Sequence, residues 1–168
     1  RAVVLFALLK AAGLAPEFVL ASSTPEIPSV RPPFLAGPGG GDFDAVLVRV
    51  KAGGDFIYLN DSDQYAALGA TDHHGCYGLA LDTGAVEILR APEDKITAAW
   101  AAYRIVVQPY GDAAITRTRR YLGTEFEAAH RKFAEMPPEE RRRYQQEAVA
   151  QIAQSAEAAQ DLVTRFDG

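Results

Sequence analysis

Residues 43–63, with the sequence FDAVLVRVKAGGDFIYLNDSD, constrain the fold of this chain more than any other stretch. Apolar, β-branched and aromatic side chains dominate residues 43–50 and 55–60, and this composition predicts two strands. Between them lies Gly53-Gly54, a pair typical of the tight turn in an antiparallel hairpin. The sequence therefore predicts a hairpin here.

Alternation along these strands places Ala45, Leu47 and Asn60 on one face of the predicted hairpin. With the turn at Gly53-Gly54, the numbers of paired residues sum to 107, so Leu47 lies opposite Asn60. Side chains two residues apart on one strand share a face, which makes Ala45 a diagonal neighbour of Asn60. We therefore expect Ala45 and Asn60 to point the same way.

Residues 1–12 have the pattern of an amphipathic helix. Apolar residues recur at i, i+3, i+4 and i+7, namely Leu5, Leu8, Leu9 and Ala12. Gly13 follows, where glycine commonly ends a helix. The chain starts with Arg1 rather than Met and is already inside this pattern. We therefore expect a fragment of a longer protein, with any targeting signal upstream.

Three segments of the first half, RAVVLFALLKAAGL, FDAVLV and YLNDSD, resemble motifs of the transglutaminase-like superfamily, which has the papain-like cysteine fold. The resemblance is to the branch found in large exported bacterial multi-domain proteins. It implies an α+β fold in which a helix accompanies an antiparallel sheet, followed by a β-hairpin and two C-terminal helices. It also implies an extracytoplasmic location, either periplasmic or secreted.

In that family three residues perform the chemistry: a Cys at the N-terminus of the helix, a His on the first hairpin strand, and an acid or amide on the next strand. The resemblance places the Cys before Arg1, outside this sequence, and it places Ala45 at the His position and Asn60 at the Asp position. A methyl group neither accepts nor donates a proton, and loss of the base from such a triad costs about 10⁴ to 10⁶ in rate. We therefore interpret the site as catalytically degenerate, with no catalytic residue and no cofactor in this chain. The resemblance then implies a non-enzymatic binding or structural module, whose partner is a protein, a peptide or an adjoining domain of the same polypeptide.

Two other interpretations stay open. The first is an active transglutaminase-like or protease-like cysteine enzyme, with its Cys upstream and its base moved to His73, His74 or His130. The second is a metal site built from Asp72, His73, His74 and Cys76. These are metal-ligand residue types, but adjacent side chains diverge in an extended loop. The simplest prediction is a solvated turn before a strand in which Cys76 is a small buried hydrophobe.

Composition narrows the function classes. A chain of 168 residues with 48% hydrophobic content can bury a core. The net charge is −5 and no segment is strongly basic, so nucleic acid is not an expected partner. No apolar run reaches 18 residues, so we expect no membrane insertion of this segment.

The remaining first-half sequence completes a sheet. Residues 22–42 are rich in Pro and Gly, which predicts a long irregular loop. We place a domain boundary after residue 92, with 1–92 as a partial transglutaminase-like core and 93–168 as a hairpin plus helical extension that continues into a further domain. Further strands are expected at 17–21, 77–81 and 86–89.

The second half is predicted to contain a hairpin. Residues 96–108 and 114–122 are rich in β-branched and aromatic residues and flank a turn at 109–112, although four Ala residues leave a helix over 96–102 as an alternative. On the second strand, Arg117 and Arg119 share one face. A solvated strand face is the simpler interpretation of these arginines, and an anion site is the alternative.

Two helices are expected after this hairpin. Thr124 and Glu127 have the spacing of a capping box, which predicts the start of a helix that ends before Pro137. A second, longer helix is expected from Pro138. Its predicted apolar stripe consists of Val149, Ile152, Ala153, Ala156, Ala159 and Val163.

Overall fold

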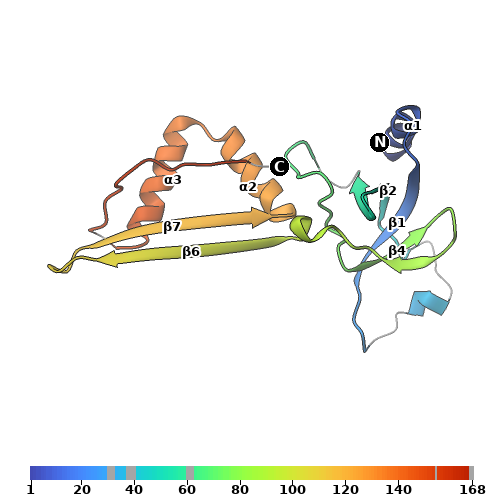
Figure 1. Ribbon diagram of the computed structural model, residues 1–168, viewed down its shortest axis with the longest axis horizontal. Coiled ribbons are helices and arrows are strands. Elements are labelled where there is room, and N and C mark those ends of the chain that lie inside the picture. Colours follow the sequence, from blue (N-terminus) through green and yellow to red (C-terminus); the bar gives the residue numbers. More distant parts are fainter. Residues whose placement is uncertain (30–32, 37–40, 60–62, 154, 167–168) are drawn as a thin grey trace.

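The computed structural model describes residues 1–29, 33–36, 41–59, 63–153 and 155–166 of the chain. It is an α+β protein with a five-stranded antiparallel sheet, a two-stranded sheet and C-terminal helices, which confirms the predicted class (Figure 1). The helices are α1 (Ala2–Ala11), α2 (Thr124–Glu135) and α3 (Pro138–Ala150), with 3-10 turns at η1 (Pro33–Ala36) and η2 (Glu93–Lys95). The strands are β1 (Pro16–Pro25), β2 (Ala45–Ala52), β3 (Asp55–Leu59), β4 (Cys76–Ala80), β5 (Val86–Ile88), β6 (Ala98–Val107) and β7 (Ala113–Leu122).

β2 and β3 form the hairpin that the sequence predicts. They pair from Val48 with Leu59 to Ala52 with Asp55, so the predicted register is confirmed. The turn glycines at 53 and 54 have φ values of 64° and 109°, a region that glycine enters without strain. In the sheet, β2 lies between β3 and β1.

The five-stranded sheet curls around its own core. Its strand order is β3-β2-β1-β4-β5, yet side chains from both edges pack together. Tyr58 of edge strand β3 shares one buried cluster with Leu89, which follows edge strand β5. The cluster, which we call the sheet core, consists of Val19, Ala21, Leu47, Tyr58 and Leu89.

α1 covers the other face of this sheet. Phe18 points away from the sheet core because it is adjacent to Val19 in β1, and neighbouring side chains on a strand alternate. The ring of Phe6 in α1 stacks on Phe18 with 4.4 Å between centroids. α1 ends as predicted, with Gly13 at a φ of 83°. The helix and the sheet core therefore lie on opposite sides of the sheet.

β1 is longer than the strand expected at residues 17–21. It continues to Pro25, which pairs with Cys76, and the amide of Glu26 donates a hydrogen bond to the carbonyl of Gly75 at 2.7 Å. The predicted loop therefore begins as strand, because β4 supplies backbone partners that local composition does not reveal. Residues 30–32 and 37–40 of that predicted loop lie outside the described residues.

β6 and β7 form a second hairpin that projects away from the five-stranded sheet (Figure 1). They pair from Ala98 with Leu122 to Val107 with Ala113, as the sequence predicts. α2 and α3 lie along one side of this hairpin (Figure 1). We call residues 96–122 the hairpin arm.

α2 begins without the predicted capping box. Gly123 is its N-cap, and this residue has no side chain with which to cap the helix. The Oγ1 atom of Thr97 instead accepts a hydrogen bond from the amide of Thr124 at 3.2 Å and lies 3.0 Å from the Thr124 hydroxyl. The capping prediction is wrong because Thr97, at the base of the hairpin arm, binds the residue that was expected to cap.

α3 ends at Ala150, so the predicted continuation of this helix to Val163 is wrong. The chain then turns back along α3 toward α2 (Figure 1). The side chain of Gln145 holds the returning segment, because its amide donates to the carbonyl of Gln160 at 2.7 Å and its oxygen accepts from the amide of Leu162 at 3.2 Å.

Phe166 fixes the end of this returning segment. Its ring stacks on the imidazole of His130 with 4.4 Å between centroids and packs against Phe126 at 6.5 Å. Packing of the Phe166 ring against His130 and Phe126 stabilises this arrangement more than helix propensity would stabilise a helix in the alanine-rich sequence after α3. Tertiary contacts therefore override the local helical pattern.

Side chains before β4 join the two halves of the chain. The Tyr65 hydroxyl donates to Glu135 at 2.9 Å, and its carbonyl accepts from His130 at 3.0 Å. Asp63 forms an ion pair with Arg131 of α2. The domain boundary after residue 92 stays a prediction, and these contacts attach α2 to the first half.

Candidate functional site

Ala45 begins β2 and pairs with Ala21 of β1. Its methyl group packs against the sheet core, on the same side as Leu47. The side chain at position 45 therefore points away from α1, at whose start the resemblance places the nucleophile. Asn60, the predicted neighbour of Ala45, lies outside the described residues.

The three histidines bind the backbone at three separate places. His73 donates from Nδ1 to a β1 carbonyl at 3.2 Å. His74 accepts at Nδ1 from the amide of Ala91 at 3.0 Å, and His130 donates from Nδ1 to the carbonyl of Tyr65. None of these contacts involves a residue of α1, so they hold each imidazole at another part of the fold.

Cys76 begins β4 and is buried, as the sequence predicts. Burial, together with the negative charge of Asp44, raises the pKa of its thiol. A raised pKa favours the protonated thiol, whereas a nucleophilic cysteine needs a lowered one.

The residues proposed for a metal site do not form a ligand cluster. Asp72, His73 and His74 lie in a turn before β4, and two of the ring nitrogens already bind backbone groups. Across the part of the chain that the structure describes, no group of three or more His, Cys, Asp or Glu side chains is arranged to hold a metal ion.

Arg49 forms a buried ion cluster that the sequence does not predict. It is 5% exposed and lies inside the curled sheet, where its Nε donates to Glu17 at 2.7 Å and its guanidinium also pairs with Glu87. The guanidinium carbon lies 3.9 Å from the centroid of the Phe56 ring. Burial by itself lowers the pKa of Arg49, but the hydrogen bonds and charges of Glu17 and Glu87 more than offset burial and raise it.

The signal for this cluster is an arginine in the middle of an otherwise apolar strand. Its partners Glu17 and Glu87 come from β1 and β5, and β5 reaches Arg49 only because the sheet curls. The Arg49 ion cluster and the sheet core together fill the interior of the curled sheet. The face of the sheet that contains Ala45 is therefore packed against other side chains.

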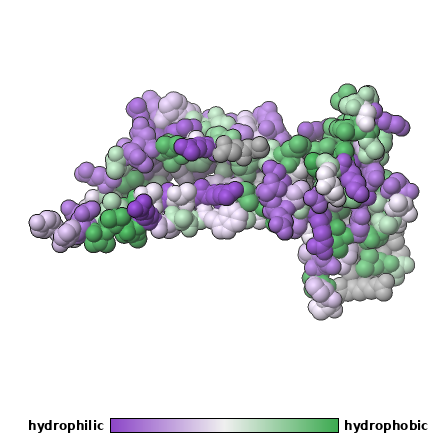
Figure 2. Space-filling view, viewed as in Figure 1, coloured by the Kyte–Doolittle hydropathy of each residue, from purple (hydrophilic) through white to green (hydrophobic). Residues whose placement is uncertain are grey.

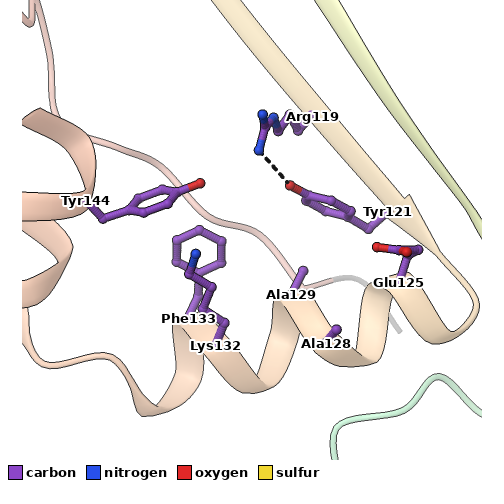
Figure 3. Close-up of a pocket in the computed structure, with 8 residues that line it drawn as sticks. All are labelled: Arg119, Tyr121, Glu125, Ala128, Ala129, Lys132, Phe133 and Tyr144. Carbon is purple, nitrogen blue, oxygen red and sulfur yellow. Dashed lines mark hydrogen bonds between the residues drawn. The ribbon is translucent and has the colours of Figure 1, made fainter. Parts of the chain in front are cut away.

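A cavity of about 190 Å³ lies between β7, α2 and α3 (Figure 3). Arg119 donates to the Tyr121 hydroxyl at 3.5 Å, and the Lys132 ammonium lies 4.2 Å from the centroid of the Tyr144 ring. The cavity is smaller than the roughly 300 Å³ at which ligand pockets begin. It is lined by Arg119, Tyr121, Glu125, Ala128, Ala129, Lys132, Phe133 and Tyr144.

This cavity corrects the prediction for the arginines of β7. The face with Arg117 and Arg119 also carries Tyr121 and is the one that α2 packs against, so it is not simply a solvated strand face. Both cations at the cavity already contact aromatic side chains. The size of this cavity is that of a gap in packing.

No protein-family model, curated protein or solved structure matches this chain significantly. The transglutaminase-like resemblance therefore rests on the sequence segments, and what it implies is a proposal. In the described ranges, every helix is too short or too polar to cross a membrane.

Proposed function

We propose that this chain is a non-catalytic binding or structural module of a larger exported bacterial protein, and that it derives from a transglutaminase-like domain. The observation that carries the proposal is Ala45. The resemblance assigns this residue to the position of the family's general base, and its methyl group packs against the sheet core on the side opposite α1. A base at this position would not face a thiol at the start of α1.

The other chemically active side chains support the same function. A nucleophile and its base must lie within about 3 Å of each other, or be bridged by one water. His73, His74 and His130 each bind a backbone group outside α1, and burial raises the pKa of the Cys76 thiol. Among the described residues, the hydrogen bonds of these imidazole rings all go to backbone groups, and none joins a ring to the Cys76 thiol.

The hairpin arm supports a binding role. Large apolar side chains along it are half-exposed or more: Tyr103 is 55% exposed, Ile105 59% and Val107 68%. Figure 2 shows hydrophobic residues gathered toward the tip of the arm, bordered by hydrophilic ones. Contiguous exposed apolar side chains of this kind mark interaction surfaces.

The test restores the missing nucleophile. The residues Cys-Ala-Ala are added before Arg1, so that a thiol stands where the resemblance places it, and Cys76→Ala removes the native thiol. We expect this thiol to react with iodoacetamide at the rate and apparent pKa of an unfolded Cys peptide, and to catalyse no transfer between a glutamine peptide and an amine. Adding Ala45→His should change neither result, because residue 45 faces the sheet core.

The competing enzyme hypothesis makes the opposite prediction. A base moved to His73, His74 or His130 would ionise the added thiol below neutral pH and give measurable acyl transfer. Such reactivity, if it disappears when one of these histidines is changed to Ala, would show that the site is active and the proposal wrong.

A further inference from the structure

The hairpin arm carries a charge opposite to that of the chain as a whole. Residues 96–122 contain four arginines and a single acidic residue, Asp112, which gives a net charge of +3. The complete chain has a net charge of −5. The element that projects from the rest of the fold therefore has a local excess of positive charge, because it contains few acidic residues (Figure 1).

The two faces of the arm differ in what covers them. The face that carries Arg119 and Tyr121 packs against α2 near the base of the arm, whereas its residues toward the tip, among them Tyr103, Ile105 and Val107, are exposed. The other face, which we call the outer face, is exposed at every position between Trp100 and Val106 and between Ala114 and Arg120. It consists of Trp100, Ala102, Arg104 and Val106 of β6 and Ala114, Thr116, Thr118 and Arg120 of β7.

The outer face combines cations with an exposed indole. Trp100 is 52% exposed and pairs directly across the strands with Arg120. Arg104 is four residues along β6, so its side chain emerges about 13 Å from that pair. Within the described residues, neither Arg104 nor Arg120 has a carboxylate at salt-bridge distance.

These features define the chemistry of a complementary partner. Trp and Arg are the residue types that contribute most to protein interfaces. Because Arg104 and Arg120 emerge about 13 Å apart along one face, they match carboxylates at i and i+4 of an extended segment. Side chains at i+2 and i+6 point the same way as those carboxylates, so apolar residues there would lie beside Trp100 and Val106, which are both partly exposed.

Charge argues against two other occupants. A second copy of the chain docked face to face would bring Arg104 and Arg120 against the same arginines, with like-charge repulsion. A nucleic acid would be repelled by the remainder of the chain, because residues 61–95 alone contain seven acidic and two basic residues and have a net charge of −5.

We propose that the outer face of the hairpin arm binds an acidic, extended polypeptide segment with carboxylates at i and i+4 and apolar side chains at i+2 and i+6, all on one face of the segment. This inference rests on the proposed binding function and gives that function a surface and a partner class. Arg104 and Arg120 select the charge of the partner, and Trp100 contributes the apolar contact.

The indole also supplies the measurement, because Trp100 is the only tryptophan of the chain. The complete chain is titrated with the eight-residue peptide Glu-Thr-Val-Thr-Glu-Thr-Val-Thr, which we call the Glu-Val peptide because Glu and Val alternate along one face, while Trp100 emission is recorded at low and at physiological salt. We expect a saturable shift of the emission to shorter wavelength and weaker binding as salt rises. The matched peptide with Lys in place of each Glu should leave the emission unchanged.

Charge reversal identifies the surface. The double variant Arg104→Glu/Arg120→Glu should bind the Glu-Val peptide about tenfold more weakly or worse. Arg142→Glu/Arg143→Glu makes the same change in net charge on exposed positions of α3 and should bind like the original chain. Circular dichroism of each variant shows whether the hairpin and helices are retained.

Several outcomes would overturn the proposal: unchanged Trp100 emission with the acidic peptide at millimolar concentration, equal weakening by both double variants, or tighter binding of an oligouridylate. A concentration-dependent emission shift without peptide, accompanied by a dimer in sedimentation, would assign the face to a second copy. None of these results bears on thiol reactivity, so failure here stays distinguishable from failure of the non-catalytic assignment.

Discussion

The Nε atom of Arg49 lies 2.7 Å from the carboxylate of Glu17, inside a curled sheet where the arginine side chain is 6% exposed. Glu87 pairs with the same guanidinium from β5. Arg49→Ala would leave both carboxylates without their cation and would open a void beside Phe56. We expect a loss of about 3 kcal/mol in the free energy of unfolding, measured by urea denaturation.

The matched control is Arg90→Ala. Arg90 pairs with Glu26 at 3.4 Å, but its side chain is 69% exposed, and exposed pairs contribute little. This variant should stay within about 0.5 kcal/mol of the original chain. Equal losses from the two variants would mean that Arg49 is not held in a buried cluster.

The buried thiol predicts how stability depends on pH. Because the pKa of Cys76 is raised above its ordinary value of 9.0, the unfolded chain releases this proton at a lower pH than the folded protein. This contribution to stability is complete below pH 9.0 and is lost as the pH rises through the raised value. Urea midpoints at about pH 8 and about pH 9.5 should show the decline, before Tyr58 begins to contribute.

Cys76→Ala isolates the thiol in that experiment. The variant lacks the titrating group, so its stability should fall less between the two pH values, by a few tenths of a kcal/mol. Tyr58 provides the next window, because burial raises its pKa above 10.0. An identical decline in the variant and the original chain would show that the Cys76 thiol does not titrate as described.

The elements predicted well are those whose signals are local. The β2-β3 register follows from alternation together with the pair Gly53-Gly54, and α1 ends where Gly13 permits it. The predictions of secondary structure fail where contacts with residues distant in the sequence determine the local conformation. Thr97, at the base of the hairpin arm, binds Thr124. Gln145 binds the segment after α3, although the sequence pattern of that segment predicts a continued helix.

The candidate site shows the same division between local and distant signals. The sequence predicts Ala45 on a strand, and its pairing with Ala21 is consistent with that. That α1 lies on the opposite face depends on Phe6 meeting Phe18, and no periodicity within either element specifies that contact. The buried cluster of Arg49 was missed because its two carboxylates come from separate strands that meet only when the sheet curls.

Gly78 is required by packing in the sheet core. A Cβ atom added there would lie 2.4 Å from Cδ2 of Leu89 and 3.0 Å from Cγ1 of Val19. Both of these side chains are fully buried, so neither can move aside without disturbing the core. Gly78→Ala should therefore destabilise the protein by about 1–3 kcal/mol in urea denaturation.

A double-mutant cycle tests whether Leu89 is the cause. In a Leu89→Ala background the added methyl has space, so Gly78→Ala should cost less there than in the original chain. Gly41→Ala is the control, since an added Cβ meets nothing within 4 Å at that position. If the cost of Gly78→Ala is the same in both backgrounds, Leu89 is not the residue it collides with.

Phe166 is expected to determine whether the C-terminal segment stays against α2 and α3. Phe166→Ala removes the ring that stacks on His130 at 4.4 Å, and the hydrogen bond from the amide of Leu162 to Gln145 should then open more often. We expect hydrogen exchange at Leu162 to accelerate about tenfold or more, which corresponds to about 1.4 kcal/mol of local stability. Val163→Ala changes an apolar residue of the same segment that is 69% exposed, so it should leave this exchange rate unchanged. Because α3 is complete before this segment begins, its own amides should keep their protection in both variants, and a loss of protection throughout α3 would contradict the assignment of Phe166 as a local anchor.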